Sequence, residues 1–187
     1  MCVCVCARAR AYKDSDPNTQ VSFWSINEDI SGTIIFKYVF WAFAPSIAGF
    51  AHCRPVIRFD GTHLYGKYRG KLLMAIDANN KIFLLAFAVM GDEIGASWGW
   101  FLSCLQTMIR DVVLDSGICI ISDRHRGIIS SITQWPNDYV PVYHRYCIRH
   151  VASNFNTKFK DKFLKSLALK AGYAHQDHKL EKNIGLP

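Results

Sequence analysis

The segment VIRFDGTH, residues 56–63, defines the first strand of the predicted sheet. Its opening residues favour β-structure, and Asp60 comes where turn-forming residues begin, so we predict a short buried strand over 56–60. The segment ICIISDRH, residues 118–125, has the same pattern and reaches its aspartate at Asp123. On neighbouring strands these two carboxylates would stand side by side, an arrangement that attracts a divalent cation.

Composition restricts the class of protein. The chain has 187 residues, of which 50% are hydrophobic and 20% charged, and this indicates one domain with a real core rather than a disordered chain. A net charge of +7 favours a polyanionic partner, although a solvated basic surface is the alternative. Seven cysteines, with no export signal and no apolar run long enough to span a membrane, favour an intracellular protein without disulfides.

The chain divides into three parts by pattern. We predict an irregular segment over residues 1–30, a core over 31–171 and a tail over 172–187. Residues 33–51 are rich in aromatic side chains, which we expect to pack on the core, with base stacking as the alternative.

Within the core, runs of β-favouring residues alternate with helical periodicity after a first group of three strands. We place strands at 56–60, 72–76, 82–90, 118–121 and 139–143, the last an edge strand because of Pro141. A helix with Ser97 as its N-cap carries an apolar face from Trp98 to Val112, and a shorter one follows Asp123. From Cys147 we predict a single long helix with apolar side chains through Leu167.

This order is that of a ribonuclease H-like α/β fold, a three-stranded antiparallel meander plus parallel strands flanked by helices. The fourth strand of that fold lies parallel beside the first, so Asp60 and Asp123 would emerge at adjacent strand ends. Each aspartate alone is more simply a turn or a helix cap. The two together favour a metal site, because like charges a few Å apart need a cation between them. Two Mg²⁺ ions about 4 Å apart could activate a nucleophile at a phosphodiester.

Several motifs extend this pattern into a family resemblance. From about residue 31 to the C-terminus, the chain resembles the transposase domain of plant Mutator-like elements. The motifs that carry the resemblance are DGTHL (60–64), GKYRGKLL (66–73), DANN (77–80), SW and WFL (97–102), ISDRHRGI (121–128) and YHRYCIRHV (143–151).

The resemblance implies a nuclear protein with a ribonuclease H-like fold that cleaves and transfers DNA strands. Three acids hold Mg²⁺ or Mn²⁺ in that family, and by motif position Asp60 resembles the first acid and Asp123 the second. The resemblance also implies DNA as the partner, with no membrane, and a protein that can form a homo-oligomer.

The third acid is where the resemblance fails. The chain has only three glutamates, Glu28, Glu93 and Glu181, and none stands at the position of the family's third acid. The predicted strand over 72–76 is also about two residues shorter than in relatives. We therefore expect a fold incomplete at its C-terminus and a fragment that does not cleave DNA, its third acid lying outside this chain or lost. The alternatives are a non-catalytic DNA-binding or transcription-regulating protein derived from a transposase, and a relic without a biochemical role.

The pair Cys147 and His150 resembles the family's Cys/His motif. A closed zinc site needs four ligands, so a packed helix start is the simpler interpretation and a contact with DNA an alternative. Lysines between 158 and 165 indicate a solvated helix face, or DNA contact. The side chains that we predict as DNA contacts are His63, Lys67, Arg124, Arg126, Cys147 and His150; His63 and His125 could also lie near the metal, or be surface histidines.

Overall fold

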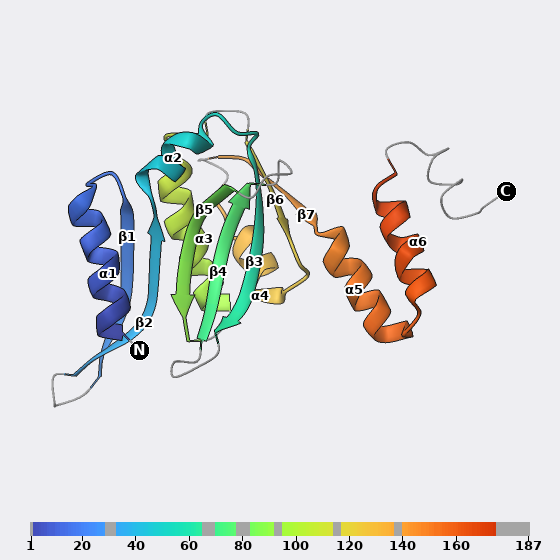
Figure 1. Ribbon diagram of the computed structural model, residues 1–187, viewed down its shortest axis with the longest axis horizontal. Coiled ribbons are helices and arrows are strands. Elements are labelled where there is room, and N and C mark those ends of the chain that lie inside the picture. Colours follow the sequence, from blue (N-terminus) through green and yellow to red (C-terminus); the bar gives the residue numbers. More distant parts are fainter. Residues whose placement is uncertain are drawn as a thin grey trace. The chain divides into compact units, whose positions relative to one another are not determined.

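A seven-stranded mixed sheet forms the centre of the computed structural model (Figure 1). The structure describes residues 2–28, 33–64, 70–77, 83–91, 95–113, 117–136 and 140–174. The strands are β1 (Gln20–Glu28), β2 (Thr33–Ala42), β3 (Val56–Leu64), β4 (Gly70–Asp77), β5 (Phe83–Met90), β6 (Ile118–Ser122) and β7 (Val142–Tyr146). The helices are α1 (Cys2–Ser15), α2 (Ala44–Phe50), α3 (Gly95–Ile109), α4 (Arg126–Thr133), α5 (Ile148–Phe159) and α6 (Lys162–Gly172).

The strand order confirms the predicted fold class. Along the sheet the order is β1-β2-β5-β4-β3-β6-β7. Strands β3, β4 and β5 pair antiparallel in sequence, and β6 returns to lie parallel beside β3. This is the ribonuclease H-like arrangement of three meandering strands with the fourth beside the first. Strands β1 and β2 extend it on the β5 side.

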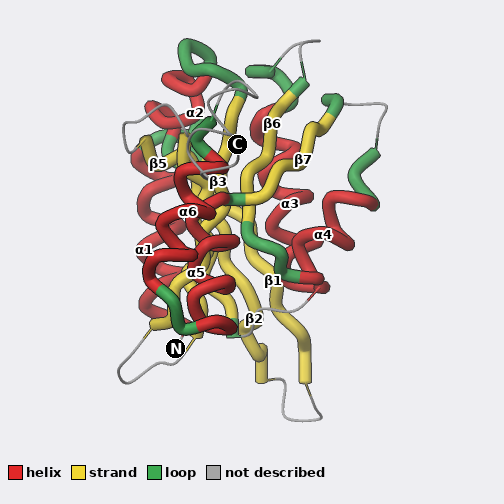
Figure 2. Tube along the Cα trace, turned by 90° about the vertical axis from the view of Figure 1, so that its right-hand side faces the viewer, coloured by secondary structure: helices red, strands yellow, loops and turns green. Residues whose placement is uncertain are grey.

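The core lies between the sheet and α3. Phe59 of β3 is 1% exposed and packs edge-on against Phe101 of α3, and Trp98 completes the ring cluster. Phe40 of β2 also contacts Phe101, as expected for the aromatic-rich segment. Figure 2 shows α1 on the opposite side of the sheet from α3 and α4. One face of the sheet therefore carries the main core, and the other carries β-strand side chains beside α1.

Residues group into two compact units, Met1–His144 and Arg145–Pro187. The first holds most of the sheet with α1 to α4, and the second holds α5 and α6, which pack on each other. The predicted boundaries after residues 30 and 171 stay predictions. Among the described residues, no helix is both long enough and apolar enough to cross a bilayer.

Regular structure in the N-terminal segment corrects the expectation that residues 1–30 are irregular. Helix α1 covers Cys2–Ser15, and β1 pairs with β2 along Gln20–Glu28. The helix has almost no apolar periodicity to predict it, because its apolar residues fill positions 2–7 and then alternate with arginine instead of recurring at spacings of three and four. The strand is fixed by its partner, since pairing with β2 supplies hydrogen bonds that local sequence does not reveal.

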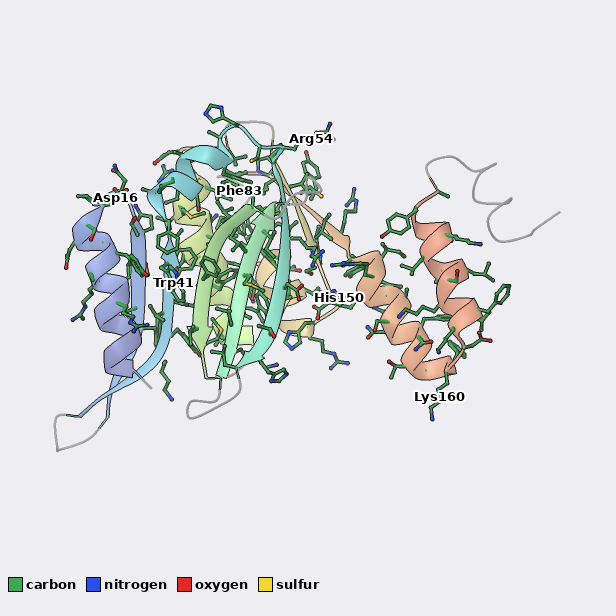
Figure 3. The ribbon with its side chains drawn as sticks, viewed as in Figure 1. Asp16, Trp41, Arg54, Phe83, His150 and Lys160 are labelled. Carbon is green, nitrogen blue, oxygen red and sulfur yellow. The ribbon has the colours of Figure 1, made fainter. Side chains whose placement is uncertain are left out.

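Three further boundaries differ from prediction. Ser97 is the third residue of α3 and fully buried, so it is no N-cap; the helix begins at Gly95. The single helix predicted from Cys147 is two helices, because Lys160 adopts a left-handed conformation (φ 53°) and Asp161 caps α6 (Figure 3). The strand predicted over 139–143 lies at Val142–Tyr146, because Pro141 has no N–H to give and precedes the strand.

Strand β4 pairs irregularly with β5 at one point, and that this segment is shorter than in relatives stays a prediction. Its register against β5 shifts between Ala75 and Ile76: Ala75 pairs with Ala86, and Ile76 pairs with Leu84. Leu85 is left as an extra residue on β5, which is the geometry of a β-bulge. The irregularity is therefore confined to the pairing of β4 with β5, while the pairing of β3 with β4 remains regular.

Candidate metal site on strands β3 and β6

The parallel register of β3 and β6 brings Asp60 and Asp123 to the same level. Val56 pairs with Cys119, Ile57 with Ile120 and Arg58 with Ile121. Two residues further along each strand stand the two aspartates. Neighbouring strands lie about 4.8 Å apart, so the fold brings the backbones of two segments that are far apart in the sequence next to each other just before the two aspartates. The pairing of these two strands is as the sequence predicts, and a metal site at Asp60 and Asp123 stays a prediction.

The alternation of burial puts both aspartates on the face of the sheet that α3 does not cover. Burial alternates along β3, with Ile57 and Phe59 in the core and Arg58 and Asp60 half-buried. The same alternation along β6 ends with Ser122 buried and Asp123 half-buried. Because side chains alternate with a period of two, Asp60 and Asp123 share one face.

Asp60 differs from prediction in its place along the strand. The strand predicted over 56–60 continues to Leu64, so Asp60 is in its middle. The reason is that the two neighbours of β3 end at different points. Pairing with β6 stops at Arg58, whereas β4 supplies partners as far as Leu64. Asp60 thus stands just beyond the last residue of β3 that pairs with β6.

Arg58 forms an ion pair with the first aspartate. Its Nη2 donates to Oδ2 of Asp60 at 3.0 Å, and the two side chains are 26% and 32% exposed. Its Nε is buried and has no hydrogen-bond partner among the described residues. Arg58 was not predicted as a site residue, although its spacing of two from Asp60 on a strand was the signal for a shared face. The guanidinium supplies a positive charge beside Asp60, which reduces repulsion between the carboxylates.

Asp123 ends its strand as a turn residue. Its Oδ1 accepts a hydrogen bond from the backbone N–H of His125 at 2.9 Å. His125 in turn caps α4, since its Nδ1 accepts from Gly127 N at 3.2 Å. Histidine is an uncommon N-cap, so sequence reasoning did not identify this role.

Ser122 connects the end of β6 to β7. Its buried hydroxyl donates to the carbonyl of Asp123 at 2.7 Å and lies 2.9 Å from Nε2 of His144. The hydroxyl thereby holds the backbone that carries Asp123. Neither Ser122 nor His144 was predicted in this role, because their 22-residue separation makes the contact visible only after folding.

The two carboxylates fit a divalent cation that is shared with a phosphate. Mg²⁺ is commonly held by one or two carboxylates together with substrate phosphate oxygens and water. Within the described part of the chain these hydrogen bonds use Oδ2 of Asp60 and Oδ1 of Asp123, so Asp60 Oδ1 and Asp123 Oδ2 are the atoms that would hold the ion. Within the described residues there is no group of three or more His, Cys, Asp or Glu that could hold a metal. Glu93 and Glu181 lie outside the described residues, as does the side chain of Glu28.

The predicted DNA contacts near the aspartates include one residue of β3 and two that follow β6. His63 stands three residues beyond Asp60, on the opposite side of the strand, and its Nε2 is 2.7 Å from Nζ of Lys71. Arg124 and Arg126 are exposed on either side of His125. Lys67 lies outside the described residues. Contact of these side chains with DNA stays a prediction.

Cys147 and His150 lie at the start of α5 in the second unit. Cys147 is 6% exposed and occupies the N-cap position, without a side-chain cap bond. His150, labelled in Figure 3, is half-buried and its Nδ1 has no hydrogen-bond partner among the described residues. The two residues agree with a packed helix start, and zinc binding by them stays a prediction.

Comparisons with known proteins complete the description. The catalytic core domain of HTLV-2 integrase, solved with magnesium in a dimeric form, is 12% identical, with a TM-score of 0.31; the match covers 71% of this chain and 83% of that one. The catalytic domain of the Mos1 mariner transposase is 11% identical, with a TM-score of 0.37, covering 74% and 84%. No curated protein matches. The family model "MULE transposase domain" matches residues 56–154, from the start of β3 into α5. With more than half of its length matched, this chain belongs to the MULE transposase domain family.

Proposed function

We propose that the chain is a transposase-type core that binds DNA and holds a divalent cation, Mg²⁺ or Mn²⁺, between Asp60 and Asp123. The β3–β6 register is the observation that supports this proposal, because its last pair, Arg58 with Ile121, stands two residues before each aspartate. Membership of the MULE transposase domain family supports DNA as the substrate class. The nucleus is proposed as the site of action. We also propose that the chain can form a homo-oligomer.

The chemistry follows from what two carboxylates can do with a bound ion. A divalent cation at this position would neutralise a DNA phosphate and polarise its P–O bonds for attack by water or a 3′-hydroxyl. Asp60 and Asp123 would position the ion, and Ser122 would fix the backbone of Asp123 through its 2.7 Å hydrogen bond. Arg58 would hold Asp60 at its other oxygen.

A chain with two acids is proposed to bind the cation weakly and to leave DNA uncut. The three glutamates of the sequence do not supply a third acid at the family's position. The Arg58–Asp60 ion pair supports the second candidate, a non-catalytic DNA-binding or transcription-regulating protein derived from a transposase. In that case the ion pair would take the place of the cation at Asp60.

Calorimetric titration with Mn²⁺ tests the proposal. The intact chain is expected to bind weakly, and Asp60→Asn and Asp123→Asn are each expected to abolish that binding. Asp161→Asn is the matched control, because it removes the same charge at the N-cap of α6, where the amide oxygen can still cap the helix. Indistinguishable titrations for the intact chain, Asp60→Asn and Asp123→Asn would overturn the metal site.

The second measurement is cleavage of a labelled duplex in Mg²⁺. The intact chain is expected to leave the duplex uncut, and binding of the duplex without cleavage would favour the non-catalytic candidate. Cleavage that disappears in Asp60→Asn would contradict the proposed inactivity while supporting the site.

A further inference from the structure

The positive charge of the chain is concentrated in α5 and α6. The whole chain has a net charge of +7. Residues 145–174 alone carry seven basic side chains against one acid, Asp161, a net charge of +6. The basic residues are Arg145, Arg149, Lys158, Lys160, Lys162, Lys165 and Lys170. Such a concentration in a 30-residue segment indicates a polyanionic partner for this unit.

One exposed face of α6 interleaves lysines with aromatic rings. Lys162, Ser166, Lys170 and Tyr173 follow each other at spacings of four, four and three, and Phe163 lies seven residues before Lys170. These spacings put all five on one side of the helix. Every one of them is exposed, and the Phe163 and Tyr173 side chains are 70% and 59% exposed.

The opposite face of α6 is already used inside the hairpin. Leu164, Leu167, Ala168 and Ala171 are half-buried on the side that packs with α5. Gly172 lies so close to Ile148 of α5 that a methyl group added there would overlap it. The exposed rings are therefore not needed for the contact between the two helices.

We propose that the Lys162–Tyr173 face of α6 binds single-stranded nucleic acid, the lysines on its phosphates and the two rings against its bases. Bases of a single strand present open π-faces that stack on aromatic side chains, and lysines follow the backbone beside them. A helix that lies on a membrane separates its apolar residues from its lysines, whereas here both occupy one face. The inference extends the DNA partner of the proposed function and depends on neither the aspartates nor a metal.

Fluorescence anisotropy with a labelled single-stranded oligothymidine, measured in EDTA on the full chain, tests this surface. Phe163→Leu with Tyr173→Leu keeps apolar bulk but removes both rings, and we expect affinity to fall about tenfold or more. Lys162→Gln with Lys170→Gln is expected to reduce the slope of log affinity against log salt by about 1.4. Trp24→Leu and Lys13→Gln are the matched controls, since each alters an exposed residue of the first unit, and neither is expected to change binding.

Three comparisons decide between the outcomes. Unchanged oligonucleotide binding in either double variant would overturn the proposal. Tighter binding of a duplex than of the single strand, with the same duplex affinity after loss of the two rings, would also overturn it. Binding of the chain to vesicles of phosphatidylserine and phosphatidylcholine, without binding of the oligonucleotide, would overturn the proposal. The face would then be a membrane-binding surface. These measurements are made in EDTA and the calorimetric titration contains no oligonucleotide, so failure of the α6 surface is distinguishable from failure of the metal site.

Discussion

Replacing Arg58 with leucine should strengthen the binding of divalent cations. In the intact chain a cation at Asp60 must displace or tolerate the guanidinium, whose Nη2 lies 3.0 Å from Oδ2. Both side chains are about a quarter to a third exposed, so the ion pair contributes no more than about 1 kcal/mol. Repulsion between the guanidinium and a divalent ion about 4 Å away adds roughly 2 kcal/mol in a water-like dielectric, twice the value for two unit charges.

The two effects act in the same direction and total up to about 3 kcal/mol, which predicts roughly a hundredfold tighter Mn²⁺ binding. Leucine suits the position, because Arg58 pairs with Ile76 on one side and Ile121 on the other. It also removes the buried Nε that has no partner among the described residues. The stability of the folded chain is therefore expected to stay level or rise.

Electron paramagnetic resonance of free Mn²⁺ measures the change directly. Arg58→Lys keeps the positive charge and should resemble the intact chain, and Arg54→Leu removes a charge from an exposed position just before β3 (Figure 3). Adding Asp60→Asn to the leucine variant should abolish its binding. Equal affinities for the intact chain and Arg58→Leu would refute this account of the ion pair.

Three other predictions test the fold. Gly117→Ala should lower the free energy of unfolding by roughly 1–2 kcal/mol because of the positive φ of 73°, and by more because the added methyl group would contact the Pro141 carbonyl. Gly91→Ala is the control, since its methyl group would meet no atom within 4 Å. Equal stabilities of the two variants in denaturant unfolding would contradict this prediction. Asp161→Ala should lower the free energy of unfolding of the α5–α6 hairpin by about 1 kcal/mol and reduce its helix content, because the aspartate accepts hydrogen bonds from the N–H groups of Phe163 and Leu164. Circular dichroism measures both changes. Burial raises the pKa of Cys104 to about 11, and a hydrogen bond with Ser22 lowers it by a smaller amount. Alkylation of Cys104, followed by mass spectrometry, should therefore be slow at pH 8 and much faster near pH 11. Faster labelling of Cys104 than of Cys53 at pH 8 would contradict this effect of burial.

Strand order was predictable because it depends on apolar runs that the sequence displays. The runs ending near Asp60 and Asp123 are long and apolar enough to be buried strands. The meander and the helix between them leave few ways in which the chain can connect the two. Strand ends were less predictable, because the end of a strand is set by its neighbours. β3 runs past Asp60 only because β4 continues beside it to Leu64.

The break between α5 and α6 shows a second limit. Phe155, Phe159 and Phe163 recur every four residues, which is typical of an unbroken helix. No glycine or proline separates the helices, and a lysine takes the left-handed position that usually requires glycine or asparagine. The ion pair of Arg58 was predictable from strand alternation, whereas the contact of Ser122 with His144 required the fold.

The pairing of β3 with β6 also determines when the two aspartates meet during folding. The strands are adjacent in the sheet but separated in the chain by β4, β5 and α3, so their pairing closes one of the longest loops of the unit. Contacts of such high sequence separation form slowly and are lost when the unit unfolds. A cation bound across these strands would recognise only the native state, and its affinity would be measurable as a rise in melting temperature with ion concentration.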